Sequence, residues 1–186
     1  MRRIVNSTYI SVNGVIQDPQ DWPDNGIEPD GAGLKAQTEL LFACDAVLMG
    51  GHTYPAFAPA WMARSGDPYS DRINQMPKYV VSSTLRDPEW NNTTVITGDV
   101  VAEIRRLKEQ PGMDIVQYGF GQLSYTLLEH GLLDELRLWV HPLFVGKATA
   151  ADLMFRPSAT VQMEHVGTLP LNTGIVVLTY RIPSSR

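Results

Sequence analysis

The sequence has 186 residues with a formal net charge of −5, and 44% of its residues are hydrophobic. A chain of this length is typically one domain, here expected to span residues 1–186, and its acidic balance without a basic tract argues against nucleic acid as a partner. No stretch approaches the ~20 apolar residues that a membrane helix needs, so we expect no membrane partner either.

The chain holds a single cysteine, Cys44, which cannot form a disulfide within the chain. Its apolar neighbours favour a buried core thiol over a nucleophile. An unpaired cysteine is typical of a reducing compartment, and the N-terminal segment is too polar for a signal peptide. We therefore expect a cytoplasmic protein.

The first predicted element is a strand over residues 4–12, which is rich in β-branched and aromatic residues and ends at the turn signal Asn13-Gly14. Residues 17–33 follow as a loop of prolines, glycines and acidic residues. Ordered loops of this length in compact domains are often lids or binding loops. Trp22 is either a clamp over a ligand or a plug against the domain, and we favour the plug.

A helix over residues 34–44 comes next, because its apolar residues recur at helical spacing. Asp30 lies near the start of this helix. An acidic side chain there gains from the helix dipole and commonly serves as a cap.

A short apolar strand over residues 45–49 leads directly into Gly50 and Gly51. Glycine lets backbone amides approach a ligand closely, and the free N–H groups of a helix that begins at His52 would attract an anion. Thr53 is suited to cap that helix or to bind a phosphate oxygen. An ordinary strand-to-helix turn would explain the two glycines equally well.

Residues 57–75 predict one or two short helices with a loop between them, and residues 78–82 predict a buried strand. This strand ends in the hydroxyl residues Ser82, Ser83 and Thr84. Ligands bind at the carboxyl ends of parallel strands, although hydroxyl side chains also end strands for ordinary turn reasons.

The next predicted elements are a strand over 93–97, an amphipathic helix over 100–109 and a strand over 114–117. A second glycine-lined turn follows, with Gly119, Phe120 and Gly121, and it opens a helix whose leucines share one face. The turn lacks the third glycine of the dinucleotide fingerprint, so it does not predict a Rossmann site.

A long strand in the segment DELRLWVHPLFVG (134–146) has two different faces, one of leucine and valine and the other with Arg137, Trp139 and His141. An aromatic side chain that points outward from an edge strand invites pairing, so this strand is a candidate interface of a homodimer. Two further strands over 160–168 and 174–182 predict an antiparallel pair at the end of the sheet.

The four histidines are far apart and show no metal-ligand spacing, so the sequence indicates no zinc site. It also contains no nucleophile elbow and no phosphate-loop lysine. The chemistry would then come mainly from a bound cofactor, and hydride transfer fits that condition.

Five motifs in this order resemble the dihydrofolate reductase-like superfamily, and within it the single-domain relatives of the reductase domain of the bifunctional riboflavin-biosynthesis deaminase/reductase. The motifs are STYISVNGVIQ, CDAVLMGGHTY, KYVVSSTL, YGFGQL and GLLDELRLWVHPLFVG. The resemblance implies an α/β fold of three αβα layers, with a mixed, mainly parallel central sheet and a C-terminal antiparallel hairpin. It also implies NADPH along the carboxyl ends of the central strands.

Carried over by position, the resemblance implies a set of cofactor-binding residues. Val15 and Ile16 would lie beside the nicotinamide, Gly50, Gly51, His52 and Thr53 near the phosphates, Ser82 and Ser83 on the adenosine side, and Gly119, Phe120, Gly121, Gln122 and Leu123 against the pyrophosphate. Asp30 would be the substrate-binding carboxylate, which anchors a pteridine- or pyrimidine-like ring and relays a proton. Glu39 is the other candidate acid.

Two positions depart from the family pattern. Many relatives have an arginine suited to the 2′-phosphate of NADPH where this chain has Gly51, which leaves the choice between NADPH and NADH open. Phe120 stands where small residues are usual. We expect an NADPH-dependent reductase of a small heterocyclic substrate, related to 5-amino-6-(5-phosphoribosylamino)uracil reductase. The alternative is an inactive nucleotide- or flavin-binding module on the same fold.

Overall fold

A computed structural model describes residues 1–23, 31–158 and 160–183 of the chain. Its strands, whose bounds follow, form one eight-stranded sheet. They are β1 (Ile4–Ser11), β2 (Cys44–Gly50), β3 (Lys78–Val81), β4 (Thr93–Ile96), β5 (Asp114–Tyr118), β6 (Glu135–His141), β7 (Glu164–Pro170) and β8 (Val176–Arg181). The helices are α1 (Ala32–Phe42), α2 (Tyr54–Met62), α3 (Pro68–Gln75), α4 (Val100–Glu109) and α5 (Gln122–Glu129), with short 3₁₀ helices at Pro19–Asp21 and Ala150–Asp152.

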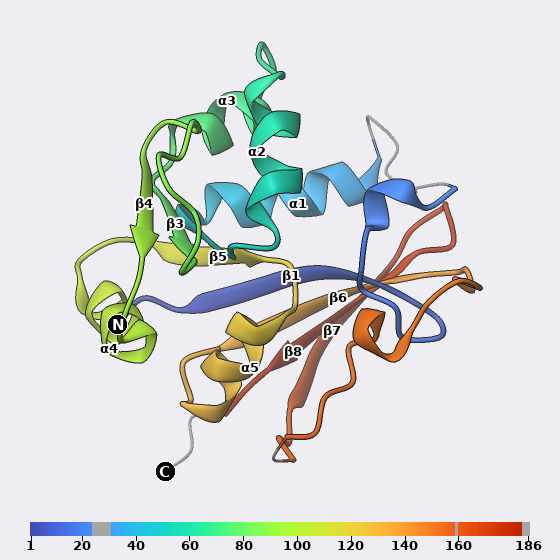
Figure 1. Cartoon of the computed structure of the whole chain (residues 1–186). Coiled ribbons are helices and arrows are strands. Elements are labelled where there is room, and N and C mark those ends of the chain that lie inside the picture. Colours follow the sequence, from blue (N-terminus) through green and yellow to red (C-terminus); the bar gives the residue numbers. More distant parts are fainter. Residues whose placement is uncertain (24–30, 159, 184–186) are drawn as a thin grey trace.

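The strand order in the sheet is β4-β3-β2-β5-β1-β6-β8-β7. The pairs from β4 to β6 are parallel, and β8 runs antiparallel to both of its neighbours, β6 and β7. Helices α1, α2 and α3 cover one face of the sheet, and α4 and α5 cover the other (Figure 1). The predicted three-layer α/β fold with a mainly parallel sheet and a C-terminal antiparallel hairpin is confirmed.

Alternation along the strands places the core on both faces of the sheet, as the spacing of side chains in a strand requires. Ile4 of β1 packs in the cluster under α4 and α5, whereas Val5 packs in the cluster under α1, α2 and α3. Interior parallel strands are buried on both faces, which explains their continuous apolar runs in the sequence.

Several sequence-based boundaries differ from the structure. Cys44 begins β2 instead of ending the preceding helix, because that helix closes at Phe42 with Ala43 as its C-cap. The thiol is buried and its burial raises the pKa to about 12, so the predicted core role of Cys44 is confirmed. Strand β7 begins at Glu164, four residues later than predicted, because its pairing with β8 fixes which residues are extended.

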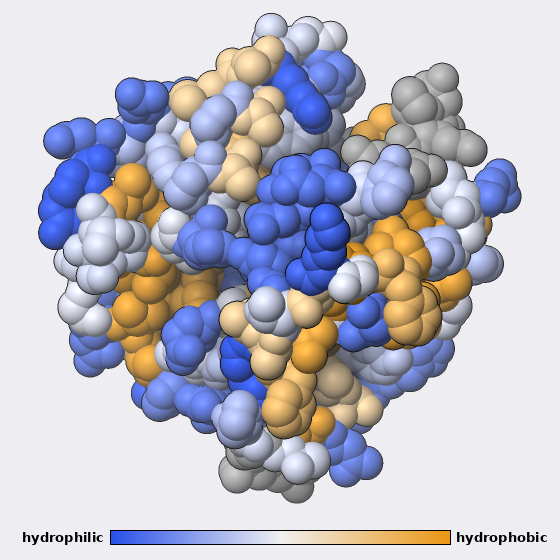
Figure 2. All heavy atoms as spheres, turned by 45° about the vertical axis from the view of Figure 1, so that its right-hand side comes forward, coloured by the Kyte–Doolittle hydropathy of each residue, from blue (hydrophilic) through white to orange (hydrophobic). Residues whose placement is uncertain are grey.

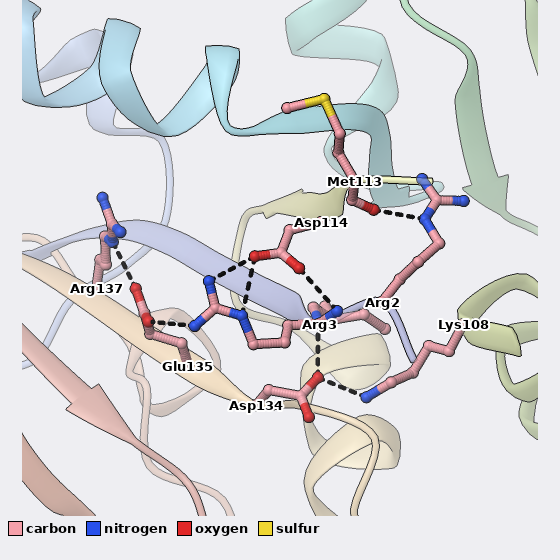
Figure 3. Close-up of polar contacts among 9 residues, drawn as sticks. Arg2, Arg3, Lys108, Met113, Asp114, Asp134, Glu135 and Arg137 are labelled. Atoms are coloured by element: carbon pink, nitrogen blue, oxygen red, sulfur yellow. Dashed lines mark hydrogen bonds and ion pairs between the residues drawn. The ribbon is translucent and has the colours of Figure 1, made fainter. Parts of the chain in front are cut away.

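The amino ends of the central strands are held by an ion-pair network (Figure 3). The Arg3 guanidinium donates to Asp114 at 2.9 Å and also faces Glu135, which accepts from Arg137 at 2.8 Å. These ion pairs therefore lie at the amino ends of the parallel strands. The sequence predicts ligand binding at the other end, where the strands have their carboxyl ends.

Trp22 is 9% exposed, and its ring meets that of His141 edge-on with 5.1 Å between centroids. The prediction that this tryptophan is a plug is confirmed. Within the described ranges, none of the helices has the length and apolar character that a bilayer crossing requires.

Candidate functional site

A cleft of about 1010 Å³ opens at the carboxyl ends of β2, β3 and β5. It brings together residues that the sequence analysis assigned to a cofactor: Ile16, Gly50, Gly51, His52, Thr53, Ser82, Ser83, Gly119, Phe120, Gly121, Gln122 and Leu123. These residues come from four separate segments of the chain. A parallel sheet places such segments side by side because its turns share one edge.

The two glycine-lined turns approach each other across this cleft. Gly119 has a φ of +77°, and a Cβ at this position would overlap Thr53 Oγ1. Glycine is required here for both its backbone conformation and its lack of a side chain. The Thr53 side chain makes no cap hydrogen bond to α2, so the predicted capping role of Thr53 is wrong. Its contact is instead with the second turn.

Gly51 is required for a different reason, since its φ is not positive. A Cβ at Gly51 would lie 2.7 Å from Ser82 Oγ, and its amide donates to Val81 O at 2.8 Å. The turn after β2 therefore rests directly on the end of β3. This packing explains why no arginine stands at position 51, because any side chain there would displace Ser82.

The second turn, Gly119–Gly121, is also held by a buried hydrogen-bond network of side-chain amides. Asn6 Nδ2 donates to Gly119 O at 2.8 Å and to Gln117 Oε1 at 3.0 Å. Gln117 Nε2 donates in turn to Ser124 Oγ at 2.7 Å. Sequence reasoning missed Asn6 and Gln117, since the signal for them is only a polar residue inside an apolar strand.

The N-terminus of α5 faces the cleft through Gly121 and Gln122, which are both exposed. Its N-cap is Gly121, and no side chain caps the helix and no acidic residue lies in its first turn. The N–H groups of such a helix end are available to an anion, and the helix dipole favours a negative charge there. The uncapped helix and the two glycine-lined turns fit the pyrophosphate of a nicotinamide cofactor.

Ser82 and Ser83, which follow β3, differ in whether their side chains are available to a ligand. Ser82 Oγ accepts from the backbone amides of Thr84 at 3.2 Å and Leu85 at 3.0 Å, so it stabilises its own turn. Ser83 is exposed at the edge of the cleft. Of the two serines, Ser83 has the side chain freer to meet a ligand.

The segment after β1 supplies Ile16 to the cleft, whereas Val15 does not line it. Val15 is 1% exposed and pairs with Leu153 in an isolated bridge. Next to Ile16, Gln17 contacts His52 through their Nε2 atoms and so links this segment to the turn after β2. The position of Asp30 lies outside the described residues.

Phe120 does not project freely into the phosphate side of the cleft. It is 6% exposed and packs edge-on against Tyr125, with 5.3 Å between ring centroids. Its side chain belongs to the core cluster under α4 and α5 and forms part of the cleft wall. The large residue in this turn is therefore accommodated by packing.

The end of the cleft near α2 and α3 is aromatic, and the sequence did not reveal it. Phe57, Trp61, Tyr69 and Tyr118 all line it. The hydroxyls of Tyr69 and Tyr118 are 2.8 Å apart. Burial raises the pKa of Tyr69 to about 12 and that of Tyr118 well above its usual value, so both phenols keep their protons at neutral pH.

Comparison with known proteins identifies the family. The RibD C-terminal domain family matches residues 2–177. The chain belongs to this family. Membership in the RibD C-terminal domain family makes the chain a relative of reductase domains of the riboflavin pathway, as the resemblance implied.

Solved structures share the fold over almost the whole chain. A putative riboflavin biosynthesis protein from Shewanella sp. PV-4 is 20% identical with a TM-score of 0.73, and the match covers 98% of this chain and 99% of that one. A pyrimidine reductase-like protein from Corynebacterium diphtheriae is 12% identical with a TM-score of 0.67, covering 99% and 93%. In sequence, the uncharacterized protein YyaP of Bacillus subtilis is 26% identical over 96% of this chain and 94% of its own length.

The same fold also occurs as one part of a longer enzyme. The deaminase/reductase from Thermotoga maritima, described as a diaminohydroxyphosphoribosylaminopyrimidine deaminase and 5-amino-6-(5-phosphoribosylamino)uracil reductase, has a TM-score of 0.66 at 15% identity. The match covers 98% of this chain and 57% of that enzyme.

Proposed function

We propose that this protein is an NADPH-dependent reductase of a small heterocyclic substrate with a pteridine- or pyrimidine-like ring. The observation that carries the proposal is the pair of glycine-lined turns at Gly51 and Gly119, which meet beside an uncapped helix N-terminus. Family membership supports the reductase class.

In this proposal the cofactor supplies the hydride, and the residues of the chain bind and orient the reactants. The backbone of Gly119 and Gly121 and the N-terminus of α5 hold the pyrophosphate, and Ile16 lies beside the nicotinamide. Ser83 contacts the adenosine side. Gln117 and Tyr118 line the cleft and are buried, so they would form part of its floor beneath the reactants.

The test is calorimetric titration of the purified protein with NADPH and, separately, with NADH. We expect NADPH to bind with a dissociation constant well below millimolar. Binding of neither cofactor at millimolar concentrations would contradict the proposal. Because position 51 carries a glycine and no arginine, the ratio of the two affinities shows whether this chain still distinguishes the 2′-phosphate of NADPH.

A second candidate function is an inactive nucleotide- or flavin-binding module. The observation that favours it is the missing arginine at position 51, where Gly51 packs directly against Ser82. Binding of NADPH without its oxidation across a panel of pterins, pyrimidines and quinones would support this second function over the first.

We propose Asp30 as the carboxylate that anchors the substrate ring and relays a proton. If so, Asp30→Asn lowers kcat/KM by about 100-fold or more, because the proton relay is lost. The measurement is NADPH oxidation with a substrate found in the panel.

The matched control is Glu39→Gln, which removes the other candidate acid. The Glu39 side chain is 67% exposed and lies 3.9 Å from Lys35, so we expect unchanged kinetics. Equal activity of the Asp30→Asn variant and the wild type would exclude Asp30 as the anchor.

The strand proposed as a dimer interface from the sequence is not an edge strand. β6 lies between β1 and β8, and Trp139 is 1% exposed with its indole N–H donating to Ser7 Oγ at 3.0 Å. The predicted edge-strand role of Arg137 and Trp139 is therefore wrong. The true edge on that side is β7, whose residues are exposed on both faces almost throughout.

We propose instead that a homodimer forms through β7, because unpaired edge strands with exposed apolar side chains invite pairing. Val166 is 44% exposed and Leu169 36%. Hydrophobic residues also gather in patches on the side of the molecule drawn in Figure 2.

We expect a dimer in sedimentation velocity across the micromolar range, and Val166→Lys should shift the protein to monomer. Val12→Lys is the control, since Val12 is 56% exposed but lies just beyond β1. A wild-type monomer at all these concentrations would exclude the dimer.

A further inference from the structure

The aromatic side chains at the α2 and α3 end of the cleft form a continuous wall. Ring centroids are 5.1 Å apart for Phe57 and Tyr118, 6.4 Å for Phe57 and Trp61, and 5.0 Å for Trp61 and Tyr69. Phe57 and Trp61 are only partly buried, so their rings remain available to a ligand. Such a wall favours a flat ring, because aromatic faces and edges pack well against another π-system.

Hydroxyl donors border this wall. The Tyr69 and Tyr118 hydroxyls share one hydrogen bond between two protons, so one proton is left for an acceptor on a ligand. Gln37 Nε2 donates to the Tyr9 hydroxyl at 2.5 Å, which leaves the Tyr9 proton free to donate. Both groups line the cleft, and they suit a ring that carries carbonyl oxygens or imine nitrogens.

Positive charge is scarce in the cleft. Among the described residues that line it, Arg64 is the one lysine or arginine, and its guanidinium lies over the Trp61 ring at 5.0 Å from the centroid. Residues 24–30, which lie outside the described part, contain no lysine or arginine in the sequence. A phosphate monoester carries about −1.5 to −2 charges at pH 7, in addition to the charges of the cofactor.

From the aromatic wall, the two donors and the single arginine, we infer that this end of the cleft binds a planar, unphosphorylated aromatic ring with conjugated carbonyl or imine groups. The inference rests on the proposed reductase function and specifies its substrate class. It separates this chain from an enzyme that recognises its substrate through a phosphate, because one stacked arginine does not match a second dianionic group.

The test compares ligands that differ by one anionic group, with and without NADPH. Riboflavin and its 5′-phosphate are titrated by flavin fluorescence anisotropy, and a naphthoquinone and its sulfonate by calorimetry. We expect the uncharged member of each pair to bind about tenfold more tightly or better. Tighter or equal binding of the anionic member, or no binding of either uncharged ligand at millimolar concentrations, would overturn the inference.

Trp61→Leu tests the aromatic wall directly. Loss of one stacking face should weaken binding of the uncharged rings about tenfold while NADPH binding is retained. Phe144→Leu is the matched control, because Phe144 is 77% exposed and does not line the cleft. Identical affinities of the two variants for the uncharged rings would show that the aromatic wall does not bind them. The proposed function fails separately if the protein does not bind NADPH. The ring affinities can be measured in that case too, because the titrations are also made without NADPH.

Discussion

Gly119→Ala is expected to lower the free energy of unfolding by about 2–4 kcal/mol and to abolish measurable cofactor binding. The φ of +77° is unfavourable for an alanine, and its Cβ would overlap Thr53 Oγ1, which forces the two turns apart. The separation would open the place that we assign to the pyrophosphate. Urea denaturation measures the first effect and calorimetry with NADPH the second.

Gly121→Ala in the same turn is the control. Gly121 has an extended backbone, and a Cβ there would meet no atom within 4 Å, so we expect a stability change within about 0.5 kcal/mol. The added methyl would still occupy space at the N-terminus of α5, so we expect it to weaken the binding of NADPH. If Gly121→Ala bound NADPH as tightly as the wild type, the pyrophosphate could not lie against this turn.

Asp134→Ala is expected to destabilise the protein by about 2–4 kcal/mol without changing cofactor affinity. Asp134 accepts from the Ile4 amide at 2.7 Å and pairs with Lys108, whose side chain is only 4% exposed (Figure 3). Removing the carboxylate leaves a buried ammonium with the Leu132 carbonyl as its remaining acceptor. Chemical denaturation combined with NADPH titration gives both quantities.

An exposed ion pair provides the comparison. Arg106 and Glu103 pair on the surface of α4 with side chains 71% and 40% exposed, so Arg106→Gln should cost at most about 0.5 kcal/mol. Replacing both partners of the buried pair, as in Lys108→Met with Asp134→Leu, should restore part of the lost stability. Equal costs for Asp134→Ala and Arg106→Gln would show that the buried pair contributes little.

The sequence predicted the order and type of the elements because their local patterns are strong. The apolar run before Gly50 is too short for a helix and is typical of an interior strand, and residues 100–109 show one clear helical face. The predicted ends of elements were less accurate where a boundary depends on a partner that is distant in the sequence. Strand β7 is an example, since β8 decides where its pairing begins.

The phosphate side of the cleft was predictable because glycine turns and strand-end hydroxyls leave local signals. The aromatic end was not, because Tyr69 and Tyr118 lie 49 positions apart and meet only after α3 has packed on the sheet. The position of β6 was likewise hidden. Its two-faced pattern resembles an edge strand, but β8 covers its outer side and packs Val177 opposite Trp139.

The place of β1 in the sheet has a consequence for how the chain is made. Ile4 is opposite Ile115 of β5, and Val5 is opposite Glu135 of β6. During synthesis the first strand therefore emerges long before either neighbour exists, and both of its edges can be paired only after β5 and then β6 have been made. Such distant pairing slows folding and leaves an apolar strand exposed to other chains while the later strands are still being translated.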